Sequence, residues 1–414
     1  MRIAIVGGGV SGLVTAYLLQ DRHEIVLFEA AGRVGGHADT HAVNQAGRQY
    51  DVDTGFVVFN VRNYPNFVRL LDRLRVESQP TSMSFSVRDE NDGFEYCGNT
   101  LNTYFAQRRN LFRPSHYRML ADILRFNREA TRLTEQRPEA TLGDLLATGG
   151  FGQDVIDRYL IPMGSAVWST DPSRMLDFPA RFLIRFFDNH GMLDVREQPD
   201  WRVIRGGSAR YVEALTASYA SKIRLNSPVT SVCRRSDQTV IVKPLTGEPE
   251  TFDHVVLATH ADLSLRILTD ATDLERELLQ AFPFQSNETV LHTDPGLLPR
   301  RRRAWASWNY HIPETPQDTV AATYNMNRLQ NLTSPYPFCT TLNRTQAIAP
   351  NRVLKVRDYA HPVFTSASVA AQQRHHEISG PRRTHFCGAY WGNGFHEDGV
   401  NSALAVCRHF GASL

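Results

Sequence analysis

Lysine is nearly absent from this chain. Positive charge is carried almost entirely by arginine, and the lysines are Lys222, Lys243 and Lys355. The net charge is only +2, so the chain lacks the large basic excess typical of nucleic-acid binding. Arginine pairs bidentately with phosphate and carboxylate groups, where lysine acts as a point charge. The high arginine content is therefore compatible with an anionic partner. We therefore expect no nucleic-acid partner.

Cysteine and long apolar runs are also scarce. The five cysteines are odd in number, widely separated and free of CxxC spacing, which predicts neither a disulfide framework nor a zinc site. We expect buried thiols for most of them and no metal. No apolar run approaches the roughly 18 residues that cross a bilayer, and strand-like sequence follows Met1 where a signal peptide would stand. The expected location is the cytoplasm.

The first thirty residues read as a βαβ unit. Residues 2–6 form a short apolar run, as in a parallel strand that is buried on both faces. Leu13, Ala16 and Leu19 then recur at helical spacing, and residues 24–29 read as a second strand. The glycine-rich turn between strand and helix therefore lies in the context that a dinucleotide-binding motif requires.

That turn fits the pattern G-x-G-x-x-G. The first glycine allows the tight turn, the second lets the backbone approach a pyrophosphate, and the third permits close helix packing. An acid closes the second strand, 22 residues after the first glycine, where it can accept hydrogen bonds from ribose hydroxyls and disfavours NADP. The expected cofactor contacts of this unit are Gly7, Gly9, Ser11, Gly12, Glu29 and Ala30.

The sequence Glu29-x-x-x-Arg33-Val34-Gly35-Gly36 resembles the extended FAD fingerprint of the flavin amine oxidase and phytoene desaturase superfamily. The resemblance implies FAD as cofactor, with Arg33 neutralising the pyrophosphate and Gly35-Gly36 admitting backbone near the flavin. Many members carry arginine or lysine after the double glycine, whereas this chain has His37. A flavin contact and a polar loop histidine are equally compatible with that departure.

Later segments resemble the same superfamily in the same order. Residues 50–56 look like the acid-then-glycine segment that passes the isoalloxazine, and residues 201–207 look like the re-entry motif. Residues 386–389 resemble the closing strand, and residues 394–400 the last flavin contact. A helix starting at Gly399 or Val400 would aim its positive end at the flavin. The cofactor contacts implied here are His37, Gly55, Phe56, Val229, Gly388, Asp398, Gly399 and Val400.

The expected fold class is α/β, with a Rossmann-like FAD-binding domain interleaved with an α+β substrate domain of the amine oxidase type. Residues 60–200 read as helical, and strand-like sequence returns near 223–225, 239–242 and 254–258. The last 30 residues read as strand, glycine turn and helix. These patterns predict FAD-binding segments at 1–60, 200–262 and 380–414, and substrate-binding segments at 61–199 and 263–379.

The resemblance to amine oxidases invites an amine substrate. Those enzymes usually carry a lysine near flavin N5, on a strand soon after the segment matching residues 255–259, and residues 282–293 contain none. That loss is similar to desaturase-like relatives. Residues 177–182, 303–310 and 389–392 look like a bacterial branch that often accompanies cyclopropane-fatty-acid-synthase-like enzymes, which implies a lipid or its acyl chain as substrate.

Removing hydride and proton from an acyl chain needs a base and an apolar lining. Candidate bases are His292, His361, His396 and Glu397, each more often structural than catalytic when taken singly. Of the many aromatic residues, Trp391 and Phe395 adjoin the flavin motif and are the expected lining residues. The candidate catalytic residues are thus His396, Glu397, Trp391, Phe395 and His361.

Peripheral membrane contact is a further expectation. A predicted helix carries basic residues on one face and apolar residues on another, and residues 300–303 are all arginine. An ordinary amphipathic helix with a solvated basic face is the stronger alternative, because Asp122 and Glu129 dilute the charge. The face in question holds Arg118, Arg125, Arg128 and Arg132, and the apolar one holds Tyr117, Leu120 and Leu124.

Four functions are compatible with these patterns. The leading one is FAD-dependent desaturation of a lipid acyl chain; the alternatives are an amine oxidase, a redox-neutral double-bond isomerase of an unsaturated lipid, and a flavin-binding protein without catalysis. Fold kinship does not decide among them. The oligomeric state and the electron acceptor leave no signal in the sequence.

Overall fold

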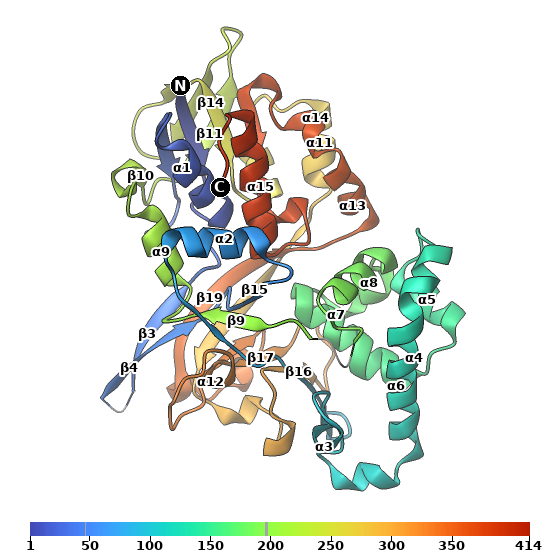
Figure 1. Cartoon of the computed structure of the whole chain (residues 1–414). Helices are drawn as coiled ribbons and strands as arrows, with labels where there is room; N and C mark the ends of the chain where they lie inside the picture. Colours follow the sequence, from blue (N-terminus) through green and yellow to red (C-terminus); the bar gives the residue numbers. More distant parts are fainter. Residues whose placement is uncertain (46, 195–197) are drawn as a thin grey trace.

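The computed structural model describes residues 1–45, 47–194 and 198–414. Its nucleotide-binding lobe, at the top of Figure 1, is built on a five-stranded parallel sheet in the order β10-β2-β1-β14-β20. The strands come from three separated stretches of chain, so the lobe is discontinuous in sequence. They are β1 (Arg2–Val6), β2 (Glu24–Phe28), β10 (Ile223–Arg224), β14 (His254–Leu257) and β20 (Thr384–Phe386).

Both faces of this sheet are covered, which explains why its strands are continuously apolar. Ile3 and Ile5 pack under α1 (Val10–Leu19) and α15 (His396–His409). Ala4 and Val6 face the other way, against the small sheet of β11 (Val229–Arg234), β12 (Val240–Pro244) and β13 (Glu250–Phe252). Alternate residues of one strand therefore serve two separate cores.

The second lobe combines a sheet with a helical bundle. The seven-stranded sheet runs in the order β19-β15-β18-β17-β16-β7-β8. Its longest strand pair, β15 with β19, is antiparallel and reaches from this lobe toward the parallel sheet. The strands are β7 (Phe85–Asp89), β8 (Phe94–Cys97), β15 (Phe284–His292), β16 (Trp308–Ile312), β17 (Ala322–Asn325), β18 (Cys339–Leu342) and β19 (Val353–Pro362).

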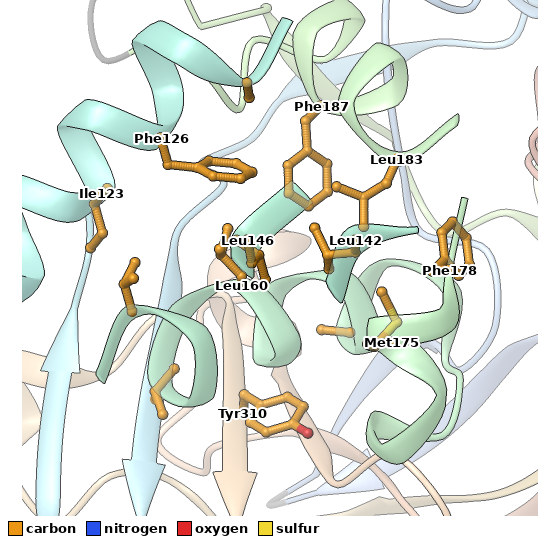
Figure 2. Close-up of a cluster of buried hydrophobic side chains, with 14 of the residues drawn as sticks. Ile123, Phe126, Leu142, Leu146, Leu160, Met175, Phe178, Leu183, Phe187 and Tyr310 are labelled. Carbon is orange, nitrogen blue, oxygen red and sulfur yellow. The ribbon is translucent and has the colours of Figure 1, made fainter. Parts of the chain in front are cut away.

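The helical bundle, at the right of Figure 1, has its own core. Its main helices are α4 (Pro114–Gln136), α5 (Leu142–Gly149), α7 (Ile161–Trp168) and α8 (Ala180–Asn189). Figure 2 shows side chains from these helices converging, with Phe126 of α4 close to Phe187 of α8 and Tyr310 of β16 at the edge. The bundle is thus joined to the second sheet through a shared apolar core.

Shorter elements complete the chain. The remaining helices are α2 (Pro65–Leu74), α3 (Leu101–Tyr104), α6 (Gln153–Val155), α9 (Ala209–Thr216), α10 (Ala261–Ile267), α11 (Asp273–Gln280), α12 (Met326–Leu329), α13 (Ser366–Gln373) and α14 (His375–Ile378). The remaining strands are β3 (Thr40–Gln45), β4 (Arg48–Asp53), β5 (Val58–Asn60), β6 (Ser78–Pro80) and β9 (Trp201–Ile204).

The mixed α/β fold class is confirmed, and so are the strands expected near residues 223, 240 and 254. The helical interpretation of residues 60–200 is wrong for 78–97, where β6, β7 and β8 lie. Asp92-Gly93 joins β7 to β8 as a hairpin, a turn signal that helical periodicity in the flanking sequence obscured. The expected domain limits stay a prediction. Of the five free cysteines, four are buried, as expected.

Truncation of the helical-bundle core is expected to destabilise the protein strongly. Phe126 is fully buried, so Phe126→Ala should lower the free energy of unfolding by about 3–5 kcal/mol, measured by urea denaturation. Phe112 is 88% exposed, so Phe112→Ala should change it by less than about 0.5 kcal/mol. Equal effects of the two substitutions would contradict the packing described here.

Candidate active site

Two glycine turns meet at the carboxyl end of β1. The backbone N–H of Gly35 donates to the carbonyl of Gly8 at 2.7 Å, which ties the second turn to the first. A Cβ on Gly12 would lie 1.9 Å from the Gly7 carbonyl oxygen, so α1 can approach β1 only with glycine there. A Cβ on Gly9 would meet nothing within 4 Å, which leaves open space in front of that backbone.

The N-terminus of α1 faces this open space. Gly9 caps the helix without any side-chain hydrogen bond, and the side chain of Ser11 is buried behind the turn. The first N–H groups of a helix have no partner within the helix and carry its positive dipole end. The cradle of Gly7, Gly9 and Gly36 is therefore shaped and polarised for a pyrophosphate.

The acid at the end of β2 organises the neighbouring backbone. Glu29 accepts hydrogen bonds from the N–H of Gly8 at 2.7 Å and of Ala31 at 2.8 Å. The Ser227 N–H donates to the Glu29 carbonyl, which brings the segment leading to Val229 beside the acid. Glu29, Ala30 and Val229 thus lie at one end of the glycine cradle, as an adenosine moiety would require.

Arg33 is held by an ion pair that the sequence did not indicate. Its guanidinium lies 3.0 Å from Asp39, which also binds Arg357 at 2.8 Å and the hydroxyl of Tyr359 at 3.0 Å. Burial opposes ionisation of Asp39, but hydrogen bonds from His41 and Arg357 and the charge of Arg33 lower its pKa. The positive charge of Arg33, which was expected to neutralise a pyrophosphate, is therefore partly neutralised by Asp39.

The C-terminal helix begins earlier than expected. α15 starts at His396, not at Gly399 or Val400, because Asp398 accepts a hydrogen bond from the Phe395 N–H and caps the first turn. A Cβ on Gly399 would lie 2.6 Å from Val10, so glycine allows α15 to pack directly on α1. Val400 is fully buried, and its side chain serves the core. The positive end of α15 still faces the glycine cradle beside α1.

Gly55 and Gly388 bring backbone segments into close contact. A Cβ on Gly55 would lie 2.1 Å from the His37 carbonyl oxygen, which also accepts a hydrogen bond from the Phe56 N–H. The Gly388 N–H donates to the hydroxyl of Ser402 in α15. Gly55 therefore lies against the His37 backbone, and Gly388 lies against α15.

Three histidines from separate segments surround one point of the site. The ring of His37 lies 5.2 Å from that of His361 on β19 and 6.5 Å from that of His260, which follows β14. All three rings are half-buried. Burial, reinforced by the neighbouring histidines, lowers the pKa of His37 well below its usual value, and burial together with His260 lowers that of His361 to about 4.

The hydrogen bonds of His361 define its tautomer. The side-chain amide of Asn287 donates to its Nδ1 at 3.0 Å, so the neutral ring carries its proton on Nε2. His361 is therefore a hydrogen-bond donor at neutral pH. The ring nitrogens of His37 and His260 bind no other group in the described part of the chain, and both rings are neutral. They are the proton acceptors that the site offers.

Two candidate bases have structural roles instead. Glu397 accepts hydrogen bonds from the N–H groups of Asn66 and Phe67 and so caps the N-terminus of α2. His396 stacks on Phe56 with ring centroids 3.5 Å apart, and its Nε2 binds the hydroxyl of Tyr211. The Glu397 carboxylate is thus used as a helix cap, and the His396 ring is fixed by Phe56 and Tyr211.

The two predicted lining aromatics lie in different surroundings. Phe395 stacks on Phe186 of α8 at 4.8 Å and packs against the helical bundle. Trp391 instead contacts Phe282 and His375 on the opposite side of its loop. Phe395 therefore remains a lining candidate, while Trp391 supports the loop from behind. His292 is fully buried against Thr341, away from the three histidines.

Sequence reasoning missed His260 and Asp39. His260 comes directly after β14, and the carboxyl ends of parallel strands are where sites form in such sheets, so its position was an available signal. Asp39 offered no comparable signal, because two of its partners, Arg357 and Tyr359, are 318 and 320 residues away in sequence.

Comparisons with known proteins agree with this geometry. A family model of the flavin containing amine oxidoreductases matches residues 10–295, more than half of the chain. The chain belongs to this family. FAD is therefore its cofactor, and it is a flavin-dependent oxidoreductase.

Individual relatives are distant. Protoporphyrinogen oxidase 2 of Arabidopsis thaliana is 27% identical over 177 residues, which is 42% of this chain but only 34% of that protein. A fatty acid isomerase from P. acnes, described as producing CLA, has a TM-score of 0.68 at 18% identity and covers 99% of this chain and 98% of its own. A putrescine oxidase has a TM-score of 0.70 at 13% identity, with 99% of each chain covered. At such identities these likenesses show the fold alone.

The residues present fit FAD. The open cradle at Gly9 and the unpaired helix N-terminus suit the pyrophosphate, and Glu29 suits the ribose. His37, Gly55 and the start of α15 would lie toward the flavin ring. The individual contacts predicted from sequence stay predictions.

Substitution of Gly9 is expected to separate cofactor binding from folding. Gly9→Ala should leave the Tm of the FAD-free protein unchanged, because its Cβ meets nothing within 4 Å, but should weaken FAD binding at least about tenfold by blocking the pyrophosphate. Gly12→Ala is the matched control and should lower the Tm, because its Cβ clashes with Gly7. FAD binding unchanged in Gly9→Ala would contradict the proposed cradle.

Proposed function

We propose that this enzyme desaturates a lipid acyl chain, transferring a hydride from the chain to FAD. The observation that carries the proposal is the uncharged character of the site where His37, His260 and His361 converge. Neutral rings there match a neutral hydrocarbon substrate. Bound FAD supplies the two-electron acceptor.

In the described part of the chain, three carboxylates near this site already have partners and are not free to bind a cationic amine. Asp39 is held by Arg33 and Arg357, and Asp262 pairs with Arg266. Asp398 caps α15, and burial raises its pKa to about 6. An ammonium group entering this region would lose its hydration without gaining a counter-charge. This arrangement favours an apolar substrate over an amine.

The lysine expected in amine-oxidising relatives is absent from the site. Lys222 binds the carbonyl of Gln20, and Lys243 lies exposed on β12. Lys355 lies exposed near the start of β19, whereas His361 is near its end. With these three the lysines of the chain are accounted for.

Aromatic side chains border the site on the helical-bundle side. Phe364, three residues beyond His361, lies 4.9 Å from the ring of Phe182, and Phe395 stacks on Phe186. The indole N–H of Trp168 donates to the Asn393 carbonyl and fixes the loop that carries Phe395. Phe182 and Phe395 are half-buried, so this wall is in part accessible to an acyl chain.

Desaturation requires loss of a proton as well as a hydride. His37 and His260, neutral and without other partners, would accept the proton, and the Nε2–H of His361 would orient the ring next to it. The full-length likeness in fold to a fatty acid isomerase favours double-bond isomerisation as the second candidate.

Anaerobic spectroscopy with product analysis tests this function. The yellow protein should bleach when titrated with phospholipids that carry unsaturated or methylated acyl chains, and the recovered lipid should have lost two hydrogen atoms by mass spectrometry. Bleaching by amines alone would overturn the proposal in favour of an amine oxidase. Lipid of unchanged mass, with a shifted double bond, would establish the isomerase instead.

The pH dependence of activity should lack an ordinary histidine ionisation. Because the pKa of His361 is lowered to about 4 and that of His37 also falls, both rings stay neutral from about pH 5.5 upward. We expect kcat/KM to stay flat between about pH 5.5 and 8, and to fall only at lower pH as the rings protonate. A step in kcat/KM centred near pH 6.5 would contradict the assigned neutral rings.

A further inference from the structure

The far tip of the helical bundle exposes a cluster of apolar side chains. It is formed by α3, the 3-10 helix η1 (Arg108–Phe112) and the start of α4, at the bottom of Figure 1. Phe112 is 88% exposed and Leu101 68%, while Tyr117 and Leu111 are 47% and 41% exposed. We call these four residues the apolar tip. Large apolar side chains gathered in this way on a surface mark interaction sites.

The apolar tip is held rigidly from below. Asn110 is fully buried and binds Gln107, and the ring of His116 stacks on Tyr104 with centroids 4.1 Å apart. The hydroxyl of Tyr104 donates to the carbonyl of His116, which closes the loop. The exposed side chains are therefore presented by an ordered turn whose inner face is packed.

Arginines surround the apolar tip. Residues 101–121 include Arg108, Arg109, Arg113 and Arg118, all exposed, and no acid. The arginine run 300–303 lies on the α3 side of the apolar tip, because η6 (Arg302–Ala304) packs against α3 and the Arg300 N–H donates to Glu95 of β8. In the described part of the chain, none of these eight guanidinium groups forms an ion pair; Arg108, for example, binds the Phe105 carbonyl.

The basic helix face expected from sequence overlaps this surface only at Arg118. Arg125 donates to the carbonyls of Gly149 and Gly150, pairs with Asp122 and lies over the ring of Phe151. Its charge is thus used inside the bundle. The arginines without an ion pair lie on η1, in the first turns of α4 and at residues 300–303.

We propose that the apolar tip docks on a bilayer that contains anionic phospholipids, with Phe112 and its neighbours entering the interface and the eight arginines contacting headgroup phosphates. An apolar centre inside a ring of unpaired cations complements a membrane surface, which offers both hydrocarbon and negative charge. The inference goes beyond the proposed reaction, since it concerns adsorption of the folded protein and not its chemistry.

Vesicle co-sedimentation of the FAD-loaded protein tests the proposal. The protein should bind phosphatidylcholine vesicles that contain phosphatidylglycerol, and binding should weaken as salt is added. It should bind phosphatidylcholine alone far less. Each arginine near the surface contributes about fivefold, so the double variant Arg109→Glu/Arg113→Glu should weaken binding at least about tenfold. Phe112→Ser should weaken binding to both kinds of vesicle.

Matched controls lie on the nucleotide-binding lobe. Arg276→Glu removes an exposed arginine of α11, and Leu245→Ser removes an apolar residue that is 65% exposed; both should bind vesicles like the parent protein. Equal loss in test and control variants, or equal binding to neutral and anionic vesicles, would overturn the proposal. So would a self-associated parent protein that Phe112→Ser converts to monomer, because the apolar tip would then contact a second copy of the chain.

Discussion

The contact between two glycine turns at the end of β1 is the constraint on which the nucleotide-binding lobe depends. Gly12 lets α1 approach the Gly7 carbonyl, and the Gly35 N–H closes the second turn onto Gly8. A side chain at Gly12 would push α1 away from β1. It would also disturb the packing of α15, which contacts α1 through Gly399. Close backbone packing, and not charge, thus builds the pyrophosphate cradle.

Beyond that cradle, charged side chains form ion pairs or cap helices. Asp39 forms ion pairs with Arg33 and Arg357, and Glu397 caps α2. The rings of His37 and His361 are neutral because burial lowers their pKa values. The ionised groups therefore stabilise the fold through ion pairs and helix caps, and the region around these histidines has neutral rings. An ammonium group in such a region would lose its hydration without gaining a counter-charge.

The two lobes contribute different kinds of groups. The parallel sheet presents strand ends and helix N-termini, which bind phosphates, whereas the helical bundle supplies aromatic side chains and the apolar tip. β19 links them, with His361 near its end and Phe364 just beyond, where the loop carrying Phe395 meets the bundle. No helix in the described ranges is long and apolar enough to cross a membrane.

Local motifs were readable from the sequence because each depends on neighbours close in the chain. The βαβ unit, its glycines and Glu29 followed from short spacings with one physical purpose each, and the segments at 33–36 and 386–389 were found by their resemblance to the flavin superfamily. Tertiary structure alone decided the rest. It brought His260 to His37 and His361, gave Asp39 its partner Arg357, and turned Glu397 into a cap of α2. It also packed η6, with part of the arginine run 300–303, against α3. These partners lie far apart in the chain, and only packing of the folded backbone determines which of them meet.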